Sequence, residues 1–282
     1  MNLQYLKKYI SNNKFLLIIL FFTIFNITVF IKYLDNIKSQ IELKEIKPHF
    51  SNKLEKYKPK KGERPNTNLS IISDKTIYLT FDDGPSYLTD SILNILKEEK
   101  VPATFFVTSK QINEYRNDII RMKKENHTVA LHSATHNYSY VYSSLNNYFN
   151  DLNKINNDVY NIIYTNSHII RLPGGSSNTV SKKYQLGIVT QITNKLTEEG
   201  YHYFDWNIDS EDASGNLEKE KIYNNVVSRL HSGTNIVLMH DAPSKKTTME
   251  ALDSIIKYGK NNNYTFAKIT NDTPPIHHHV NN

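Results

Sequence analysis

The hydrophobic pattern of the chain alternates between two periods from Ile71 onward. Short runs rich in β-branched and aromatic residues, such as Ile77–Phe81 and Ile236–Met239, have the length and composition of strands buried on both faces. Longer segments, such as Asp90–Lys100 and Leu145–Tyr164, repeat apolar residues at helical spacing. Strand and helix patterns therefore follow one another in turn, which predicts a parallel sheet with helices outside it.

This alternation gives expected bounds for each element. The expected strands cover residues 76–81, 103–107, 128–131, 168–170, 201–204, 235–239 and 264–269. The expected helices cover residues 90–100, 112–125, 145–164, 180–199, 218–230 and 251–258. About seven β/α units of this length predict an α/β fold with a distorted or incomplete (β/α) barrel. A doubly wound open sheet is the alternative.

An apolar segment near the N-terminus, Phe15–Ile31, contains no charged residue and is bracketed by Lys14 and Lys32. Its length of about 17 residues gives roughly 26 Å as a helix, close to the thickness of a bilayer core. Lysines precede the segment and no small-residue cleavage site follows it, which favours an uncleaved transmembrane anchor over a cleaved signal peptide. The segment predicts a single-pass protein of the cell membrane whose main domain lies on the extracytoplasmic side.

The chain divides into four expected regions. Residues 1–13 form a short cytoplasmic tail, 14–32 the transmembrane signal anchor, 33–70 a basic extracytoplasmic linker, and 71–282 the folded domain. The linker is expected because charged residues dominate Lys53–Arg64, a composition typical of solvated tethers.

Composition limits the chemistry that the chain can carry. With no cysteine, it can form neither a disulfide nor a thiolate metal site, so any metal ion must be held by histidine and carboxylate. The formal charge of +6 and the pI of about 9.1 are compatible with phosphate-bearing partners. No nucleic-acid-binding motif accompanies this charge, so nucleic acid is not an expected partner.

Polar motifs follow five of the predicted strands at their C-terminal ends. They are Asp82-Asp83, His132 with His136, Arg171 with Gly174, Asp205-Trp206, and His240. The C-terminal rim of the strands is where parallel α/β barrels bind their ligands. Because independent polar motifs fall on this one rim, packing alone is a poor explanation for them.

The spacing of two histidines, His132-x₃-His136, suits a zinc site but is weak evidence by itself. The adjacent acids Asp82 and Asp83 supply a third ligand and a general base, although a capping role is the ordinary alternative. Arg171, whose alternative is a surface position, would neutralise a carboxylate at the mouth of the barrel.

The remaining rim residues each have a structural alternative. His240 is interpreted as a proton donor or acceptor paired with Asp205, or else as a core histidine. Trp206 either packs in the core or forms the wall of a sugar or acyl pocket. The run His277-His278-His279 follows the last predicted strand and is interpreted as tail rather than as a metal site.

Taken in order, the motifs resemble those of a known family. These motifs are Thr80-Phe81-Asp82-Asp83-Gly84-Pro85-Ser86, His132-Ser133-x-x-His136, Arg171-x-Pro173-x-Gly175, Asp205-Trp206 and Leu238-x-His240. They resemble the five motifs of the polysaccharide deacetylases, the carbohydrate esterases of family 4 with a NodB-homology domain. The resemblance covers about Ile71–Ile269 and implies a distorted (β/α) barrel with a divalent metal ion, commonly zinc, with cobalt or another divalent ion as alternatives.

The resemblance also implies a role for each motif residue. Asp83, His132 and His136 would be the metal ligands. Asp82 would be the general base oriented by Arg171, and His240 the general acid tuned by Asp205. Leu238 and Trp206 would line a pocket for the acetyl methyl group. Gly174 stands where the family often has tyrosine, and its backbone N–H would still donate to the oxyanion.

The expected function is a metal-dependent N-deacetylase of N-acetylated glycans, acting on N-acetylglucosamine of cell-wall peptidoglycan. Within enzymes, the alternatives are deacetylation of chitin-like or poly-N-acetylglucosamine chains, or O-deacetylation of another polysaccharide. The alternative outside enzymes is an inactive glycan-binding barrel. Such a barrel would have lost catalytic or ligand residues, whereas this chain retains Asp82, His240 and the three expected ligands.

Overall fold

The computed structural model of the protein describes residues 75–215 and 217–281. The predicted tail, signal anchor and linker, residues 1–13, 14–32 and 33–70, lie outside these residues, so their bounds stay predictions. The predicted location in the cell membrane is corrected, because no helix within the described ranges has the length and apolar character needed to cross a membrane.

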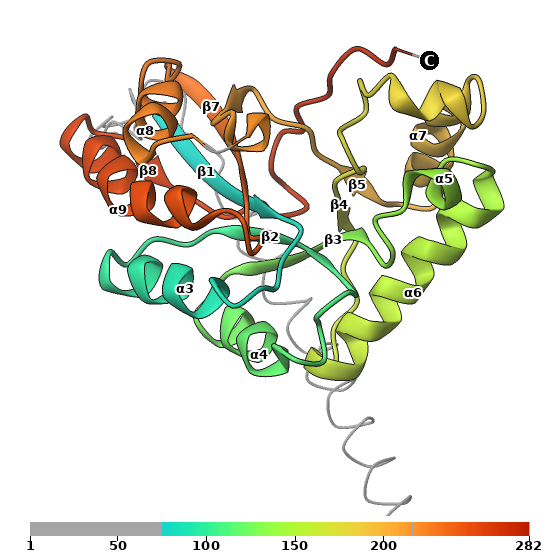
Figure 1. Ribbon diagram of the computed structural model, residues 1–282, viewed down its shortest axis with the longest axis horizontal. Coiled ribbons are helices and arrows are strands. Elements are labelled where there is room, and N and C mark those ends of the chain that lie inside the picture. The colour runs from blue at the N-terminus through green and yellow to red at the C-terminus, as the bar shows by residue number, and fades with distance from the viewer. Residues whose placement is uncertain (1–74, 216, 282) are drawn as a thin grey trace, which may run out of the picture. The chain divides into compact units, whose positions relative to one another are not determined.

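An eight-stranded parallel sheet forms the centre of the described chain. Its strands are β1 (Lys75–Asp82), β2 (Thr104–Thr108), β3 (Thr128–Ser133), β4 (Ile169–Ile170), β5 (His202–Tyr203), β6 (Ile208–Asp209), β7 (Gly233–His240) and β8 (Thr265–Phe266). They run in the order β5-β4-β3-β2-β1-β7-β6, and β8 also pairs with β1. The sheet curls in Figure 1, an arrangement that fits the predicted distorted or incomplete (β/α) barrel.

Helices cover the outer face of this sheet. They are α3 (Thr89–Glu98), α4 (Arg116–Lys124), α5 (Tyr138–Val141), α6 (Leu145–Ile163), α7 (Ile188–Glu198), α8 (Lys219–Val227) and α9 (Lys246–Asn261). In Figure 1, α3, α4 and α6 follow one side of the sheet, and α8 and α9 lie at another. Each long helix buries one apolar stripe, as Ile92, Leu93 and Leu96 do on α3, which is the packing that helical spacing predicts.

Two apolar clusters fill the two faces of the sheet. Phe105 belongs to the cluster shared with the helices, whereas its neighbour Phe106 belongs to a smaller cluster with Ile169, Phe204 and Ile236. Successive residues of a strand point to opposite faces, so β2 is buried on both and all of its residues are inaccessible. The central strands therefore appear in the sequence as continuous apolar runs, and their polar ends project from the rim.

The structure departs from the predicted elements in two respects. Residues 180–199, predicted as one helix, form a 3₁₀ turn at Val180–Lys183 and then α7, because Gly187 between them takes a left-handed φ of 74°. The hydrophobic pattern does not predict α5 or β6, since elements of four and two residues are too short to show a period.

Candidate active site

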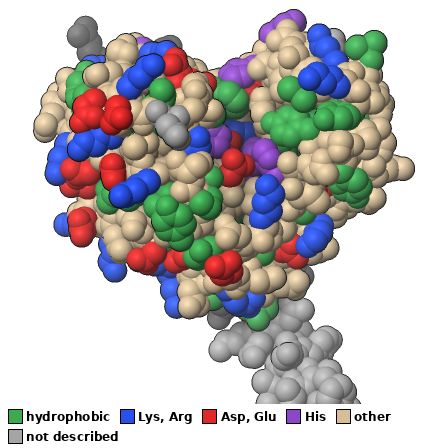
Figure 2. All heavy atoms as spheres, viewed as in Figure 1, with side chains coloured by type: hydrophobic (Ala, Val, Ile, Leu, Met, Phe, Trp, Pro, Cys, Tyr) green, Lys and Arg blue, Asp and Glu red, His purple; other side chains and the backbone are tan. Residues whose placement is uncertain are grey.

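The C-terminal strand ends meet at one rim, as the sequence predicts. Asp82 at the end of β1 is the register partner of His240 at the end of β7. Arg171 directly follows β4, which pairs with β3, the strand that carries His132. Histidine and acidic side chains meet at a hollow in the centre of the face seen in Figure 2. The fold thus brings together residues that are far apart in the sequence.

Asp83, His132 and His136 form a group that can hold a metal ion. One ligand atom from each residue lies within 4.8 Å of the others. Oδ1 of Asp83 lies 3.6 Å from Nε2 of His132 and 3.3 Å from Nε2 of His136. Nδ1 of His132 lies 2.7 Å from the carbonyl oxygen of Arg171, so Nδ1 carries the proton and Nε2 keeps its lone pair. Metal-binding histidines are typically oriented by such a second hydrogen bond.

The protonation states of this group also fit a metal ion. Burial, with a smaller contribution from the nearby His132, lowers the pKa of His136 to about 4, so its imidazole is neutral at neutral pH. Burial raises the pKa of Asp83, but electrostatic attraction to neighbouring histidines and to Lys110 outweighs this effect. The pKa of Asp83 is therefore below its ordinary value. Metal ions bind neutral imidazole and ionised carboxylate, and two nitrogens with one oxygen suit zinc.

The backbone of two of these residues is strained. Asp83 has a φ of 74° and His136 a φ of 49°, both in the left-handed region. Such a conformation costs about 1–3 kcal/mol at a residue other than glycine and persists only where the surrounding structure enforces it. Strain of this kind concentrates at functional sites, which agrees with the placement of both residues in the metal group.

Asp151 of α6 holds the loop that carries the two histidines. Its buried carboxylate accepts hydrogen bonds from Ser133 Oγ at 2.6 Å, from the Ala134 N–H at 2.7 Å, and from Thr135 N–H and Oγ1 at 3.0 and 2.7 Å. Ser133 Oγ in turn accepts from the N–H of His136 at 2.8 Å. The sequence analysis missed Asp151, although an acid within the apolar stripe of an amphipathic helix was a usable signal.

Arg171 is fully buried, and each of its three side-chain nitrogens donates a hydrogen bond near the rim. Nη1 donates to Asp82 Oδ1 at 2.8 Å and to Thr80 Oγ1 at 2.7 Å. Nε donates to the carbonyl oxygen of Phe204 at 3.0 Å, and Nη2 to that of Asp205 at 3.1 Å. The structure places Arg171 in the predicted contact with Asp82, and the surface position considered as an alternative is excluded.

His240 pairs with Asp212 rather than with Asp205. Nδ1 of His240 lies 2.7 Å from Asp212 Oδ1, and its backbone N–H donates to Oδ2 at 2.8 Å. Burial lowers the pKa of His240, but the hydrogen bond and charge of Asp212, together with Asp82 and Asp83, outweigh this and raise it to about 9. His240 is therefore positively charged at neutral pH. The predicted pairing of His240 with Asp205 is wrong.

Asp205 instead stabilises the turn after β4. Its Oδ1 accepts from the Ser176 N–H at 2.8 Å, and its Oδ2 accepts from Ser176 Oγ at 2.5 Å and from the N–H of His278 at 2.8 Å. The predicted pairing is wrong because the hydrophobic pattern does not predict the two-residue strand β6. This strand lies between Asp205 and Asp212 in the chain and pairs with β7, which brings Asp212 rather than Asp205 to His240. The acidic stretch Asp209–Asp212 was the available signal in the sequence.

The three predicted substrate-binding residues differ in their surroundings. The Trp206 ring lies 5.6 Å from the Arg171 guanidinium, and a Cβ added to Gly175 would lie 2.9 Å from that ring, so its contacts are those of a packed residue. Leu238 is buried on β7. Gly174 is exposed, has a φ of 75°, and its N–H has no hydrogen-bond partner within residues 75–215 and 217–281. Their binding of substrate stays a prediction.

The C-terminal histidines attach the last segment to β5 and the residues after it. The His277 ring stacks on Tyr203 with centroids 3.7 Å apart. The His278 ring contacts Trp206 edge to face at 4.7 Å. The metal group that the described residues form does not include either histidine.

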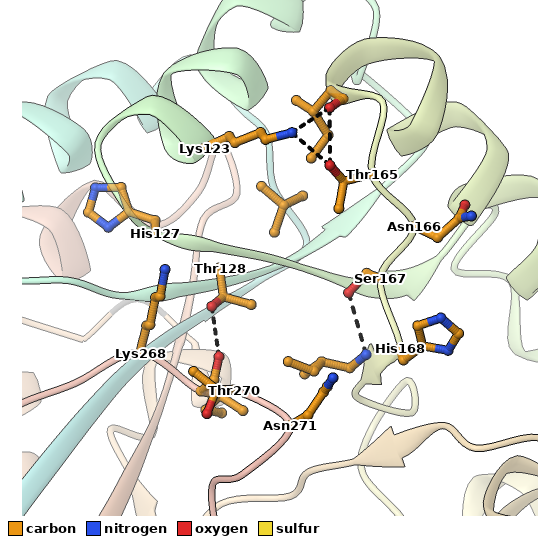
Figure 3. A pocket seen from close by; sticks show the side chains of 14 residues that line it. Lys123, His127, Thr128, Thr165, Asn166, Ser167, His168, Lys268, Thr270 and Asn271 are labelled. Carbon is orange, nitrogen blue, oxygen red and sulfur yellow. Dashed lines mark hydrogen bonds between the residues drawn. The ribbon is translucent and has the colours of Figure 1, made fainter. Parts of the chain in front are cut away.

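A separate pocket of about 320 Å³ lies at the opposite end of β3. It includes Thr128, the first residue of this strand, and is lined by Lys123, His127 and Lys268, as Figure 3 shows. Both lysines donate hydrogen bonds to oxygen atoms of the chain. The pocket contains none of the predicted site residues, which lie at the C-terminal strand ends.

Comparison with known sequences shows similarity to polysaccharide deacetylases. A sequence profile of the polysaccharide deacetylase family matches residues 71–189. The chain is 33% identical over 213 residues to the putative polysaccharide deacetylase YheN of Bacillus subtilis, covering 73% of this chain and 71% of that protein. It is 32% identical over 197 residues to a peptidoglycan-N-acetylglucosamine deacetylase of Bacillus cereus, covering 68% of each. The chain therefore belongs to the polysaccharide deacetylase family.

A solved structure agrees with this assignment. The crystal structure of the catalytic domain of peptidoglycan N-acetylglucosamine deacetylase from Eubacterium rectale matches with a TM-score of 0.71 and 44% sequence identity. The match covers 74% of this chain and 94% of that one. The family resemblance inferred from the sequence motifs is confirmed.

The contacts of Asp151 generate a prediction about metal affinity. Asp151→Asn replaces an acceptor oxygen by an NH₂ group that faces hydrogen-bond donors, so the histidine loop should lose its position. We expect the affinity for Zn²⁺ to fall about 10–100-fold, measured by competition with a chelating dye. Asp158→Asn is the matched control, since it removes a carboxylate from the same helix that contacts Ser109 and Lys154 instead. Equal affinities of the two variants would contradict the role of Asp151.

Proposed function

We propose that this protein is a metal-dependent N-deacetylase that removes the acetyl group from N-acetylglucosamine units of cell-wall peptidoglycan. One observation carries the proposal: the candidate metal group lies on the same rim as a buried carboxylate, Asp82, and a charged imidazole, His240. These are the groups that hydrolysis of an amide requires. The likeness to the E. rectale catalytic domain, over 94% of its length, supports the choice of substrate.

Asp83, His132 and His136 would hold a divalent ion, zinc or a related ion such as cobalt, which supplies a Lewis acid for the acetyl carbonyl and lowers the pKa of a bound water. The donor set and the tautomer of His132 support this assignment. The remaining steps are performed by the chain itself.

Asp82 is the general base in this proposal. Arg171 holds its Oδ1 at 2.8 Å and so fixes the direction in which the carboxylate faces. Asp82 takes a proton from the attacking water, whose oxygen bonds to the acetyl carbon. The backbone N–H of Gly174 donates to the acetyl oxygen as negative charge develops on it.

His240 is the general acid. Asp212 binds its Nδ1, which leaves Nε2 as the nitrogen available to the substrate. The imidazolium gives a proton to the amide nitrogen as the C–N bond breaks, and it is charged at neutral pH because its pKa is about 9. The products are acetate and a free amine on the sugar.

The proposed activity is tested by incubating the zinc-loaded protein with purified peptidoglycan. We expect release of acetate and, by mass spectrometry of the glycan, free amines on glucosamine units. Asp82→Asn should lower kcat by about 10²–10⁴-fold with unchanged metal content, because an amide cannot accept the proton. Asp90→Asn, at an exposed acid of α3, is the matched control. Acetate release from chitin oligomers alone would transfer the substrate to chitin-like glycans, and no release from any glycan would refute the proposal.

The metal group is tested by removing one ligand. His132→Ala should abolish stoichiometric binding of a divalent ion, since two ligands hold zinc much more weakly than three. Elemental analysis of the purified protein measures the loss. His202→Ala removes an exposed histidine on β5 and should leave the metal content as it is. Full metal occupancy in His132→Ala would show that the ion binds elsewhere.

The pairing of His240 with Asp212 predicts a change in pH dependence. His240 must be protonated to act as the acid, so kcat/KM should fall as the pH rises through its pKa of about 9. Asp212→Asn removes a negative charge, the pKa of His240 falls, and this alkaline limb should move to lower pH. Asp205→Asn should leave the limb in place, because Asp205 does not contact His240. A shift in Asp205→Asn alone would reinstate Asp205 as the partner.

A further inference from the structure

Tyr138 lies directly beside the candidate metal group. It begins the short helix α5, two residues after His136, and its ring meets the His136 ring edge to face with centroids 5.5 Å apart. The other neighbour of the ring is Tyr142, at 5.5 Å and an interplanar angle of 60°. Tyr138 is half-buried, so these two contacts hold its ring while part of the side chain stays accessible.

Tyr142 fixes the position of this helix against the turn after β4. It is fully buried, and its hydroxyl donates to the carbonyl oxygen of Pro173 at 2.7 Å. The side chain of Asn137 accepts a hydrogen bond from the N–H of Ser139 at 3.1 Å and so caps the helix. Tyr138 is therefore held in a defined place relative to Gly174, the residue that follows Pro173.

The Tyr138 hydroxyl occupies the space that a side chain at position 174 would need. A Cβ added to Gly174 would lie 2.6 Å from Tyr138 Oη, closer than such atoms approach in proteins. The phenol of Tyr138, which comes from another segment of the chain, therefore lies directly beside the backbone of Gly174.

Two hydrogen-bond donors at this place have no acceptor inside the protein. Neither the Tyr138 hydroxyl nor the Gly174 N–H has a hydrogen-bond partner among residues 75–215 and 217–281. A tyrosine hydroxyl has one proton that it can donate in a hydrogen bond. Donors left free at the edge of a site are available to a ligand, and a polar ligand atom that meets them is recognised by that contact.

We propose that Tyr138 is a substrate-binding residue whose hydroxyl donates a hydrogen bond to a ring hydroxyl oxygen of the sugar that carries the acetamido group. The inference rests on the proposed deacetylase function, in which the Gly174 N–H serves the acetyl oxygen. The Tyr138 hydroxyl lies 2.6 Å from where the Cβ of a side chain at position 174 would be, beside the backbone of Gly174. With the N–H of Gly174 bound to the acetyl oxygen, the Tyr138 hydroxyl would meet a hydroxyl oxygen on the sugar ring that carries the acetamido group. Tyr138 thereby supplies a contact that glycine at position 174 lacks.

The test is Tyr138→Phe, which keeps the ring contacts with His136 and Tyr142 and removes only the hydroxyl. With the zinc-loaded protein and a tetramer of N-acetylglucosamine as the probe, we expect KM to rise roughly tenfold, the equivalent of about 1.4 kcal/mol. We expect kcat to stay within about twofold, because a contact made equally in the ground and transition states affects binding alone. Metal content should not change. Tyr140→Phe is the matched control, since Tyr140 lies exposed on the same helix.

The alternative results separate this inference from the proposed function. A fall in kcat at constant KM would assign the hydroxyl to the transition state and overturn the inference, as would loss of metal. Kinetics identical to those of Tyr140→Phe would reduce Tyr138 to packing. If the unmodified protein releases acetate, each of these results refutes the inference alone. If it releases none from any glycan, the proposed function fails and the inference fails with it.

Discussion

Arg171 and Asp82 form an ion pair inside the protein, with side chains 0% and 4% exposed. The Arg171 guanidinium donates hydrogen bonds to Thr80 and Asp82 of β1 and to carbonyl oxygens of the segment that connects β5 to β6. One side chain thus links strand ends from opposite sides of the curled sheet. Removing one partner of such a pair would leave a buried charge without compensation, at a cost of about 3–5 kcal/mol. The position of the rim depends on this interaction.

Around this pair, the rim has two regions that favour opposite protonation states of histidine. Near His136, burial and a neighbouring histidine favour the neutral imidazole that a metal ion needs. Near His240, the Asp212 carboxylate favours the charged imidazolium that a proton donor needs. Asp151 has a third task, since it fixes the loop geometry of the metal group. Two histidines a short distance apart can thus hold opposite protonation states at one pH.

The accuracy of the sequence predictions follows the length of each element. β1, β2, β3 and β7 lie near their predicted bounds because each is buried on both faces and shows as a continuous apolar run. β6 and α5 are too short for any period, and Gly187 divides one predicted helix through a backbone conformation that hydrophobicity does not report. The missed strand β6 is also the reason that Asp205 was given the place of Asp212.

The hydrophobic pattern of the sequence determined the fold class, and the resemblance of its five motifs determined the family. The predicted strand ends also placed Asp82, Asp83, His132, His136, Arg171 and His240 on one rim, because the polar motifs follow strands whose hydrophobic pattern marks where they end. Only the tertiary structure decided which carboxylate pairs with His240, which acid holds the histidine loop, and which tyrosine stands beside Gly174. Those choices depend on distances between residues that are many positions apart, and no local pattern encodes such a distance. They are decided by how the sheet curls and how α5 and α6 pack against it.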